Sequence, residues 1–315
     1  MTDATVGPKS RVRTPFRFNS RTQRNIAIVA FLIVPVVSLV LFNIYPVLQL
    51  FWISLTDFNS ISWSRAKFVG ITNFINLAGR DQRLVAPMVN SLYYLGGSLV
   101  QIALATWFAV TLNEKLPGSQ VFRTILFLPF VLNAVAAALI FRHVLQLDGT
   151  LNDLLVAILG PGAKFQWLDA SKGYTNFSLA AASVWRYLGF NLVVTFGVLQ
   201  SIPQDQYDAA RIEGANGWQS FWRITFPSIR LVLLLQLMLS AVGSLEVFEI
   251  PQIITGGAGK TATFAINMIQ TGFQFRRAGV AAAMAVVMLL IVAIFYILTR
   301  IISRGAGMMR EEAGR

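Results

Sequence analysis

Residues 208–227 read DAARIEGANGWQSFWRITFP, a short stretch of mixed charge that lies between two long apolar runs and ends at a proline. Alanine and isoleucine favour helix in its first half, and Gly214 permits a bend. Beyond the bend, Trp218, Phe221 and Trp222 follow helical spacing and would form one bulky aromatic face. The stretch therefore predicts a helical segment that fits either a groove of a partner protein or the headgroup layer of a membrane.

The sequence around this segment is apolar enough for a membrane. Of its 315 residues, 55% are hydrophobic and only 13% are charged. Apolar runs of about 20 residues, the length that crosses a bilayer, recur along the chain. We expect an all-α polytopic membrane protein. Its six transmembrane helices are predicted near residues 26–55, 90–112, 124–146, 177–201, 229–249 and 279–303.

The distribution of lysine and arginine predicts the orientation. In this six-span model, fifteen basic residues in the tails, in the loops and near the span ends fall on the side of the two termini, and nine fall on the other side. Because basic residues near span ends are retained in the cytoplasm, both termini are expected to be cytoplasmic. The domains are then a basic N-terminal tail (1–25), a six-span domain (26–303) with a cytoplasmic segment at 204–228, and a C-terminal tail (304–315).

Other functional classes have little support in the residues. The net charge of +12 does not indicate nucleic acid, because the basic residues are dispersed among apolar segments, where topology and anionic lipid account for them. The chain has no cysteine and one histidine, and its acidic residues lack metal-ligand spacing, so we expect no catalytic residues and no metal site. Residues 256–261, GGAGKT, fail the spacing of a phosphate-binding loop because Ile254 stands where a glycine is required.

Seven positions within 208–227 carry a resemblance to a known family. In residue type and spacing they are similar to the cytoplasmic coupling motif of ABC importer permeases, with an aspartate where the family usually has glutamate and a phenylalanine where it has leucine. These positions are Asp208, Ala209, Ala210, Gly214, Ile224, Phe226 and Pro227.

Further motifs extend the resemblance from about residue 30 to residue 303. They are similar to the carbohydrate-uptake branch, and particularly to the larger permease of the maltose importer, without its large external insertion. They comprise Tyr45-Pro46, residues 68–74 (FVGITNF), residues 199–203 (LQSIP) and Thr255-Gly256-Gly257.

The resemblance implies the architecture of an ABC type I importer permease in the cytoplasmic (inner) membrane of a bacterium or archaeon. Its partners would be a homologous second permease, an ABC ATPase dimer, an extracytoplasmic solute-binding protein and membrane lipid, with no nucleic acid. This chain would bind no cofactor, and the ATPase would use ATP and Mg. The residues expected to contact the ATPase are Asp208, Ala209, Ala210, Glu213, Gly214, Ala215, Trp218, Phe221, Trp222, Ile224 and Pro227.

The resemblance also implies a path for the sugar. When the family is aligned on Ile202-Pro203 and Pro227, its sugar contacts fall on Ser183, Tyr187, Phe190, Ser240, Gly243, Ser244 and Val247. Residues at i, i+4 and i+7 share one helical face, as a path requires, although small hydroxyl residues also serve as ordinary helix contacts in membranes. Arg186 either approaches an anionic solute or is a structural side chain that pairs internally or snorkels to the interface.

Two other classes stay open. A secondary transporter of a small polar solute, driven by an ion gradient, would have inverted repeats, broken helices and carboxylates near the midplane. Here Glu246 and Glu249 lie toward a span end. A membrane scaffold that binds a partner and moves nothing is compatible with residues 208–227 alone.

Overall fold

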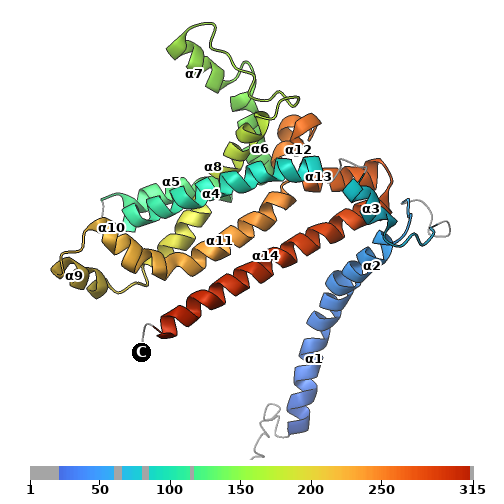
Figure 1. Ribbon diagram of the computed structural model, residues 1–315, viewed down its shortest axis with the longest axis horizontal. Coiled ribbons are helices and arrows are strands. Elements are labelled where there is room, and N and C mark those ends of the chain that lie inside the picture. Colours follow the sequence, from blue (N-terminus) through green and yellow to red (C-terminus); the bar gives the residue numbers. More distant parts are fainter. Residues whose placement is uncertain (1–20, 60–65, 80–84, 114–116, 313–315) are drawn as a thin grey trace, which may run out of the picture. The chain divides into compact units, whose positions relative to one another are not determined.

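The computed structural model describes residues 21–59, 66–79, 85–113 and 117–312, and these are nearly all helical (Figure 1). In this described part, the only β pairing is an isolated bridge between Thr56 and Phe68. The first twenty residues of the predicted N-terminal tail lie outside it. The chain divides into two compact units, Met1–Leu50 and Phe51–Arg315.

The first unit contains α1 (Arg21–Leu39), the π-helix η1 (Val40–Ile44) and the start of α2 (Tyr45–Ser54). Together they form an apolar helical run, Arg24–Ser54, of 31 residues with mean hydropathy 2.7, which is long enough to cross a bilayer. The wide turn η1 ends two residues before Pro46. Proline has no N–H and its ring clashes with the carbonyl four residues earlier, so a π-turn at this point lets the helix pass the proline.

The second unit holds the remaining helices. In chain order they are α3 (Thr72–Gly79), α4 (Val85–Asn113), α5 (Ser119–Val131), α6 (Ala134–Leu145), α7 (Thr150–Leu159), α8 (Thr175–Leu199), α9 (Gln204–Ile212), α10 (Gly217–Ser220), the π-helix η3 (Phe221–Thr225), α11 (Phe226–Glu246), α12 (Glu249–Thr255), the 3-10 turn η4 (Gly259–Thr261), α13 (Phe264–Ile269), the π-helix η5 (Gln270–Gln274) and α14 (Ala278–Glu312).

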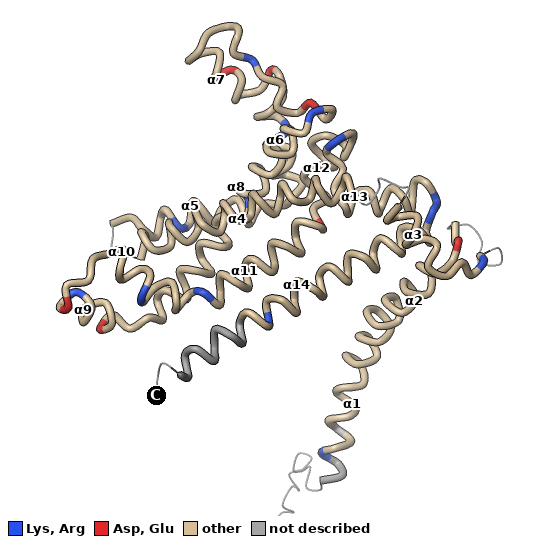
Figure 2. Tube along the Cα trace, in the orientation of Figure 1, with Lys and Arg blue, Asp and Glu red and all other residues tan. Residues whose placement is uncertain are grey.

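Four long helices of this unit form its centre. In Figure 1, α4 and α8 pack along each other, α11 packs on both, and α14 lies against α11. Figure 2 shows that charged residues gather near the ends of these helices and leave their middle parts largely uncharged. This distribution is what a bilayer requires of helices that cross it.

Small residues bring the helix backbones close together. A Cβ atom built on Gly189 of α8 would lie 2.0 Å from the carbonyl oxygen of Leu126 on α5, so only glycine fits there. One turn away along α5 and two turns away along α8, the guanidinium of Arg123 lies 4.1 Å from the centre of the Phe196 ring, which adds a cation–π contact between the same helices. Close approach at small residues is the usual way in which helices associate inside membranes.

In the described part of the chain, six helical stretches are long and apolar enough to span a membrane, as the sequence predicts. The third differs from the prediction in position. The expected span 124–146 is interrupted, because α5 contains Pro129 and ends at Val131, and Asn133 then caps α6 by accepting a hydrogen bond from the Val135 amide at 2.8 Å. The apolar stretch of sufficient length is Ala134–Leu159, which includes α6 and α7.

The fifth stretch is longer than the predicted span 229–249. The helical run Gly217–Thr255 continues through Pro227, which lies in the first turn of α11. As at Pro46, a π-helix, η3, ends two residues before it. The helix α14 continues to Glu312, but its membrane-spanning stretch is Ala278–Ile302, in agreement with the predicted span 279–303.

Candidate functional site

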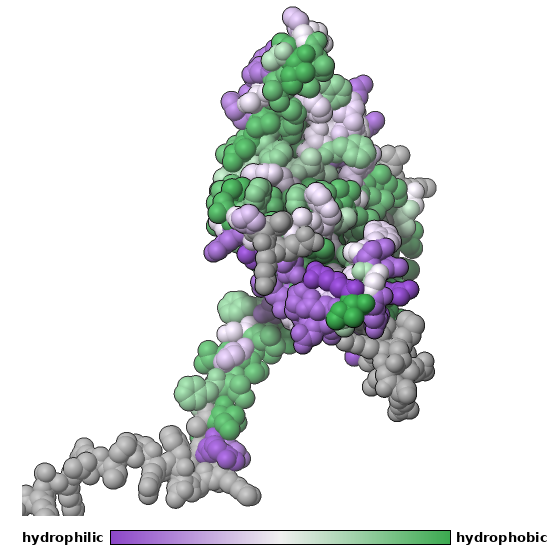
Figure 3. All heavy atoms as spheres, turned by 90° about the vertical axis from the view of Figure 1, so that its left-hand side faces the viewer, coloured by the Kyte–Doolittle hydropathy of each residue, from purple (hydrophilic) through white to green (hydrophobic). Residues whose placement is uncertain are grey.

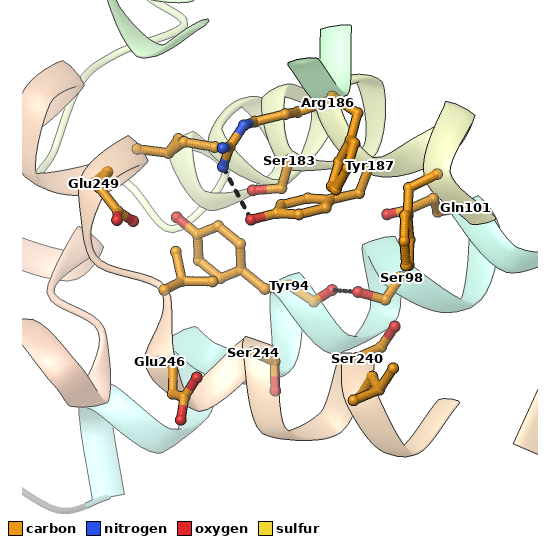
Figure 4. Close-up of a pocket in the computed structure, with 16 residues that line it drawn as sticks. Tyr94, Ser98, Gln101, Ser183, Arg186, Tyr187, Ser240, Ser244, Glu246 and Glu249 are labelled. Carbon is orange, nitrogen blue, oxygen red and sulfur yellow. Dashed lines mark hydrogen bonds between the residues drawn. The ribbon is translucent and has the colours of Figure 1, made fainter. Parts of the chain in front are cut away.

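A cavity of about 470 Å³ opens between α4, α8 and α11, with one wall from α12 (Figure 4). Ligand pockets in proteins have this size. All seven residues predicted for the sugar path line this cavity, and so does Arg186. They lie with eight residues that the sequence did not single out for the path, Tyr94, Ser98, Gln101, Phe130, Leu239, Glu246, Glu249 and Ile250.

One wall of the cavity is aromatic. Phe130 stacks on Phe190 with 4.8 Å between ring centres and an interplanar angle of 27°, and its ring centre lies 5.9 Å from that of Tyr187. Phe130 comes from the last turn of α5, beside the break before α6, which brings its ring to α8. Such a wall offers flat apolar faces to a ring-shaped solute.

The opposite wall is polar and comes partly from α4. Tyr94, Ser98 and Gln101 follow at i, i+4 and i+7, so they share one helical face. Tyr94 is only 3% exposed, yet its hydroxyl has no hydrogen-bond partner in the described part of the chain, and neither does that of Ser183. Buried hydroxyls without partners are uncommon because leaving them unpaired costs free energy, so both hydroxyls are available for a further hydrogen-bond partner.

The charged residues of the cavity lie near one end. Arg186 donates a hydrogen bond from Nη1 to the hydroxyl of Tyr187 at 2.9 Å, and its guanidinium carbon lies 4.9 Å from the centre of that ring. Glu246 ends α11 and Glu249 begins α12, and both carboxylate side chains line the cavity. Arg186 thus lines the cavity while its guanidinium also bonds the neighbouring Tyr187.

The segment 204–228 lies at the end of the second unit where α4 and α8 end and α11 begins (Figure 1). It consists of α9, a turn at Gly214 with φ +81°, and α10, which is held by a capping box between Asn216 and Gln219. Its surface includes the hydrophilic region in the lower half of Figure 3. This turn requires glycine at position 214, since a positive φ is unfavourable for residues that have a side chain.

The aromatic residues of this segment pack on one another. Trp218 is 70% exposed, whereas Trp222 packs against Trp218 and Phe226, with ring centres 5.6 and 4.8 Å apart, and Phe221 is half-buried. The face available to a partner is therefore narrower than the spacing predicts. Of the residues predicted to contact the ATPase, those exposed are Asp208, Ala209, Glu213, Gly214, Trp218, Trp222 and Pro227, while Ala210, Ala215, Phe221 and Ile224 are half-buried.

The loop on the opposite side is organised by Asn152. This fully buried side chain donates from Nδ2 to the carbonyls of Leu147 and Phe165, with the Gln146 carbonyl a longer contact at 3.4 Å. Its Oδ1 accepts from the Phe165 amide and the indole N–H of Trp167. On the surface of this loop, Lys164 donates a hydrogen bond from Nζ to the Asp148 carboxylate at 2.6 Å. This bond raises the pKa of Lys164.

The segment GGAGKT at 256–261 is a structural turn. The amide of Lys260 donates to the carbonyl of Ala170 at 2.9 Å, and the Asn176 side chain donates to the Lys260 carbonyl at 2.9 Å. Thr261 is fully buried. These contacts use the backbone groups that a phosphate-binding loop would direct at its ligand.

A polytopic helical protein with a polar cavity between its spans has the construction of a membrane transport subunit. The sequence profile of the family described as "Binding-protein-dependent transport system inner membrane component" matches residues 101–307. The chain belongs to this family of ABC importer permeases. It is a transport subunit and not an enzyme, since the ATPase of such a system is a separate chain.

Individual relatives cover nearly the same length. The chain is 34% identical to the osmoprotective compounds uptake permease protein GgtC of Synechocystis sp., over 79% of this chain and 88% of the relative. It is 29% identical to the trehalose/maltose transport system permease protein MalF of Thermococcus litoralis, over 84% and 90%. A chain of a bacterial alginate ABC transporter, crystallised with an alginate pentasaccharide-bound periplasmic protein, has the same fold, with TM-score 0.75 at 22% identity over 89% and 96%.

Proposed function

We propose that this permease carries a sugar, a polyol or an oligosaccharide and forms half of the translocation pathway. The observation that carries the proposal is the cavity, whose lining contains all seven residues predicted for the sugar path. The relatives are named for trehalose and maltose or for osmoprotective compounds. An ion-driven secondary transporter has no support from the family.

The chemistry of the lining suits such a solute. A sugar ring presents C–H faces that pack on aromatic rings, and Phe130, Tyr187 and Phe190 supply that surface. Sugar hydroxyls need partners that both donate and accept, and serine and tyrosine hydroxyls do both. Ser183, Ser240 and Ser244 provide such groups on two facing helices.

A permease that forms half of the translocation pathway requires a second permease that forms the other half. The proposed assembly contains a homologous second permease, two ATPase subunits that use ATP and Mg, and an extracytoplasmic solute-binding protein, in the cytoplasmic membrane. The periplasmic protein in the alginate transporter complex supports the last of these partners. Both termini and the segment 204–228 then face the cytoplasm, in agreement with the distribution of basic residues.

In this proposal the segment 204–228 transmits ATPase closure to the cavity. It is continuous with α11 through η3, and α11 carries Ser240, Gly243 and Ser244 on the cavity wall. A displacement of the segment therefore acts on the wall through one helix. Nucleotide binding and solute access then bias the same two arrangements of the helices, which is the requirement for coupling.

The experiment is co-purification of the solubilised wild-type protein and its Gly214→Pro variant, with mass spectrometry of the bound chains. We expect a P-loop ATPase and a second six-span protein with the wild type, and loss of the ATPase alone in the variant. Gly217→Ala is the matched control, because Gly217 lies in the same segment with open space around its Cβ position and without a positive φ. A wild-type chain recovered without any ATPase would contradict the proposal.

A further inference from the structure

The charge balance of the cavity is opposite to what Arg186 alone suggests. The lining contains one guanidinium and the two carboxylates of Glu246 and Glu249, so its formal charge is negative. In the described part of the chain, neither carboxylate has a lysine or arginine within ion-pair distance. A cleft lined by an excess of one sign attracts the opposite charge and repels its own.

Arg186 is less available to a solute than the carboxylates are. Its Nη1 donates to the Tyr187 hydroxyl, its guanidinium carbon lies over the Tyr187 ring, and its Nε is buried without a hydrogen-bond partner in the described part of the chain. The side chain is thus held along α8 as a support for Tyr187. The two glutamates are exposed, and Figure 4 shows them at the end of the cavity where Arg186 also lies.

Hydrogen-bond chemistry leads to the same conclusion. A carboxylate only accepts hydrogen bonds, so Glu246 and Glu249 require donors from whatever fills the cavity. The buried hydroxyls of Tyr94 and Ser183, which have no partner in the described part of the chain, can donate or accept. A solute hydroxyl donates to the exposed carboxylates, whereas an acidic solute brings further acceptors and like charge, which disfavours it against the glutamates.

We infer that the cavity selects uncharged, hydroxyl-rich solutes, and that Glu246 and Glu249 exclude acidic ones. This inference rests on the proposed function and specifies the chemical class of its solute. It assigns Arg186 to the positioning of Tyr187 rather than to recognition of an anion.

The potential in the cavity can be measured without knowing the solute. The chain has no cysteine, so Ser240→Cys places a single thiol on the cavity wall. In the assembled complex in nanodiscs, the thiol is treated with trimethylammonioethyl or sulfonatoethyl methanethiosulfonate. Rates of modification of this chain are followed by intact mass and normalised to those of a free thiol. We expect the cationic reagent to react faster than the anionic one by about tenfold.

The variants identify the source of the preference. The double substitution Glu246→Gln and Glu249→Gln should remove most of the preference for the cationic reagent, whereas Arg186→Gln should increase that preference. Asp153→Asn, which removes an exposed carboxylate on α7 outside the cavity, is the matched control and should leave it unchanged. Neutral methyl methanethiosulfonate should modify all variants at similar rates, which shows that access is intact. A faster reaction of the anionic reagent, or a preference that the double variant keeps, would overturn the inference.

A second measurement links the potential to solute. The Ser240→Cys thiol is modified by the neutral reagent in the presence of maltose, trehalose or sucrose, and separately of glucuronate or oligoalginate. Protection by neutral sugars in the parent protein, with protection by the acids only after the double glutamine substitution, is the expected result. Protection of the parent by the acids would contradict the exclusion. If neither group protects any variant while the cationic preference holds, the proposed sugar function fails and the measured potential remains.

Discussion

The hydroxyl of Tyr207 on α9 lies 2.9 Å from the hydroxyl of Thr225, the last residue of η3. Thr225 is almost fully buried, and it directly precedes α11. This bond therefore connects the exposed helix of the segment 204–228 to the base of a helix that lines the cavity.

Removing this bond should weaken coupling more than folding. Tyr207→Phe deletes one hydrogen bond, worth about 1 kcal/mol, and we expect solute-stimulated ATPase activity of the assembled complex to fall several-fold with little change in yield. Thr225→Val should have the same effect, and the double variant should be no worse than either single one. Additive losses would show that the two hydroxyls act independently. Tyr296→Phe, on the outer part of α14, serves as the control.

The contact between α5 and α8 predicts a stability difference between two glycines of one helix. Gly189→Ala places a Cβ atom 2.0 Å from the Leu126 carbonyl oxygen, so α5 must move away, at a cost of about 1–3 kcal/mol. Gly197→Ala, on the same helix with nothing within 4 Å of its Cβ position, should be neutral or slightly stabilising. Thermal unfolding of the detergent-solubilised protein measures both, and equal midpoints would contradict the packing described for Gly189.

A substitution at Tyr94 should change uptake without lowering thermal stability. Tyr94→Phe removes a buried hydroxyl that has no partner in the described structure, so thermal stability should stay the same or rise. If that hydroxyl serves the solute, uptake in reconstituted vesicles should fall several-fold at low solute concentration. Tyr93→Phe, the neighbouring residue on a different face of α4, should change neither property. A stability loss without an uptake loss would assign Tyr94 a purely structural role.

Asn152 should be essential for the order of residues 146–167. Asn152→Asp keeps the accepting oxygen and loses the Nδ2 donor that bonds the carbonyls of Leu147 and Phe165 and contacts that of Gln146. We expect faster amide hydrogen exchange in this loop while exchange in α4 and α8 stays unchanged. Asp153→Asn is the control at the adjacent exposed position. Unchanged exchange in the loop of the Asn152→Asp variant would mean that other contacts hold it.

Most of the spans could be predicted because hydropathy is a local property that can be summed along the chain. The break before α6 was missed because a sum over apolar residues passes over Pro129 and Asn133, although these two residues are a proline inside a helix and a helix cap. The predicted start of the fifth span at residue 229 is too late, since the π-helix η3 lets the helix continue through Pro227.

The resemblance predicted the cavity residues on α8 and α11, but it did not predict those on α4. Tyr94, Ser98 and Gln101 have the same i, i+4, i+7 spacing that made the α8 residues candidates, so a signal was present in the sequence. Phe130 had none, since its place on the cavity depends on the contact of α5 with Gly189 and on the break that follows it.

The sequence by itself determined that this protein crosses a membrane through helices. It also located the segment 204–228, which is predicted to contact a partner. The length and apolarity of each run are sufficient to predict a spanning helix. Backbone N–H and C=O groups that lack hydrogen bonds are too costly in lipid, and a helix pairs them within one segment. Only the tertiary structure decided which face of each helix lines the cavity and that two glutamates share it with Arg186. Inside a membrane the lipid is as apolar as a protein interior, so hydrophobicity does not distinguish the faces, and close packing and hydrogen bonds determine them.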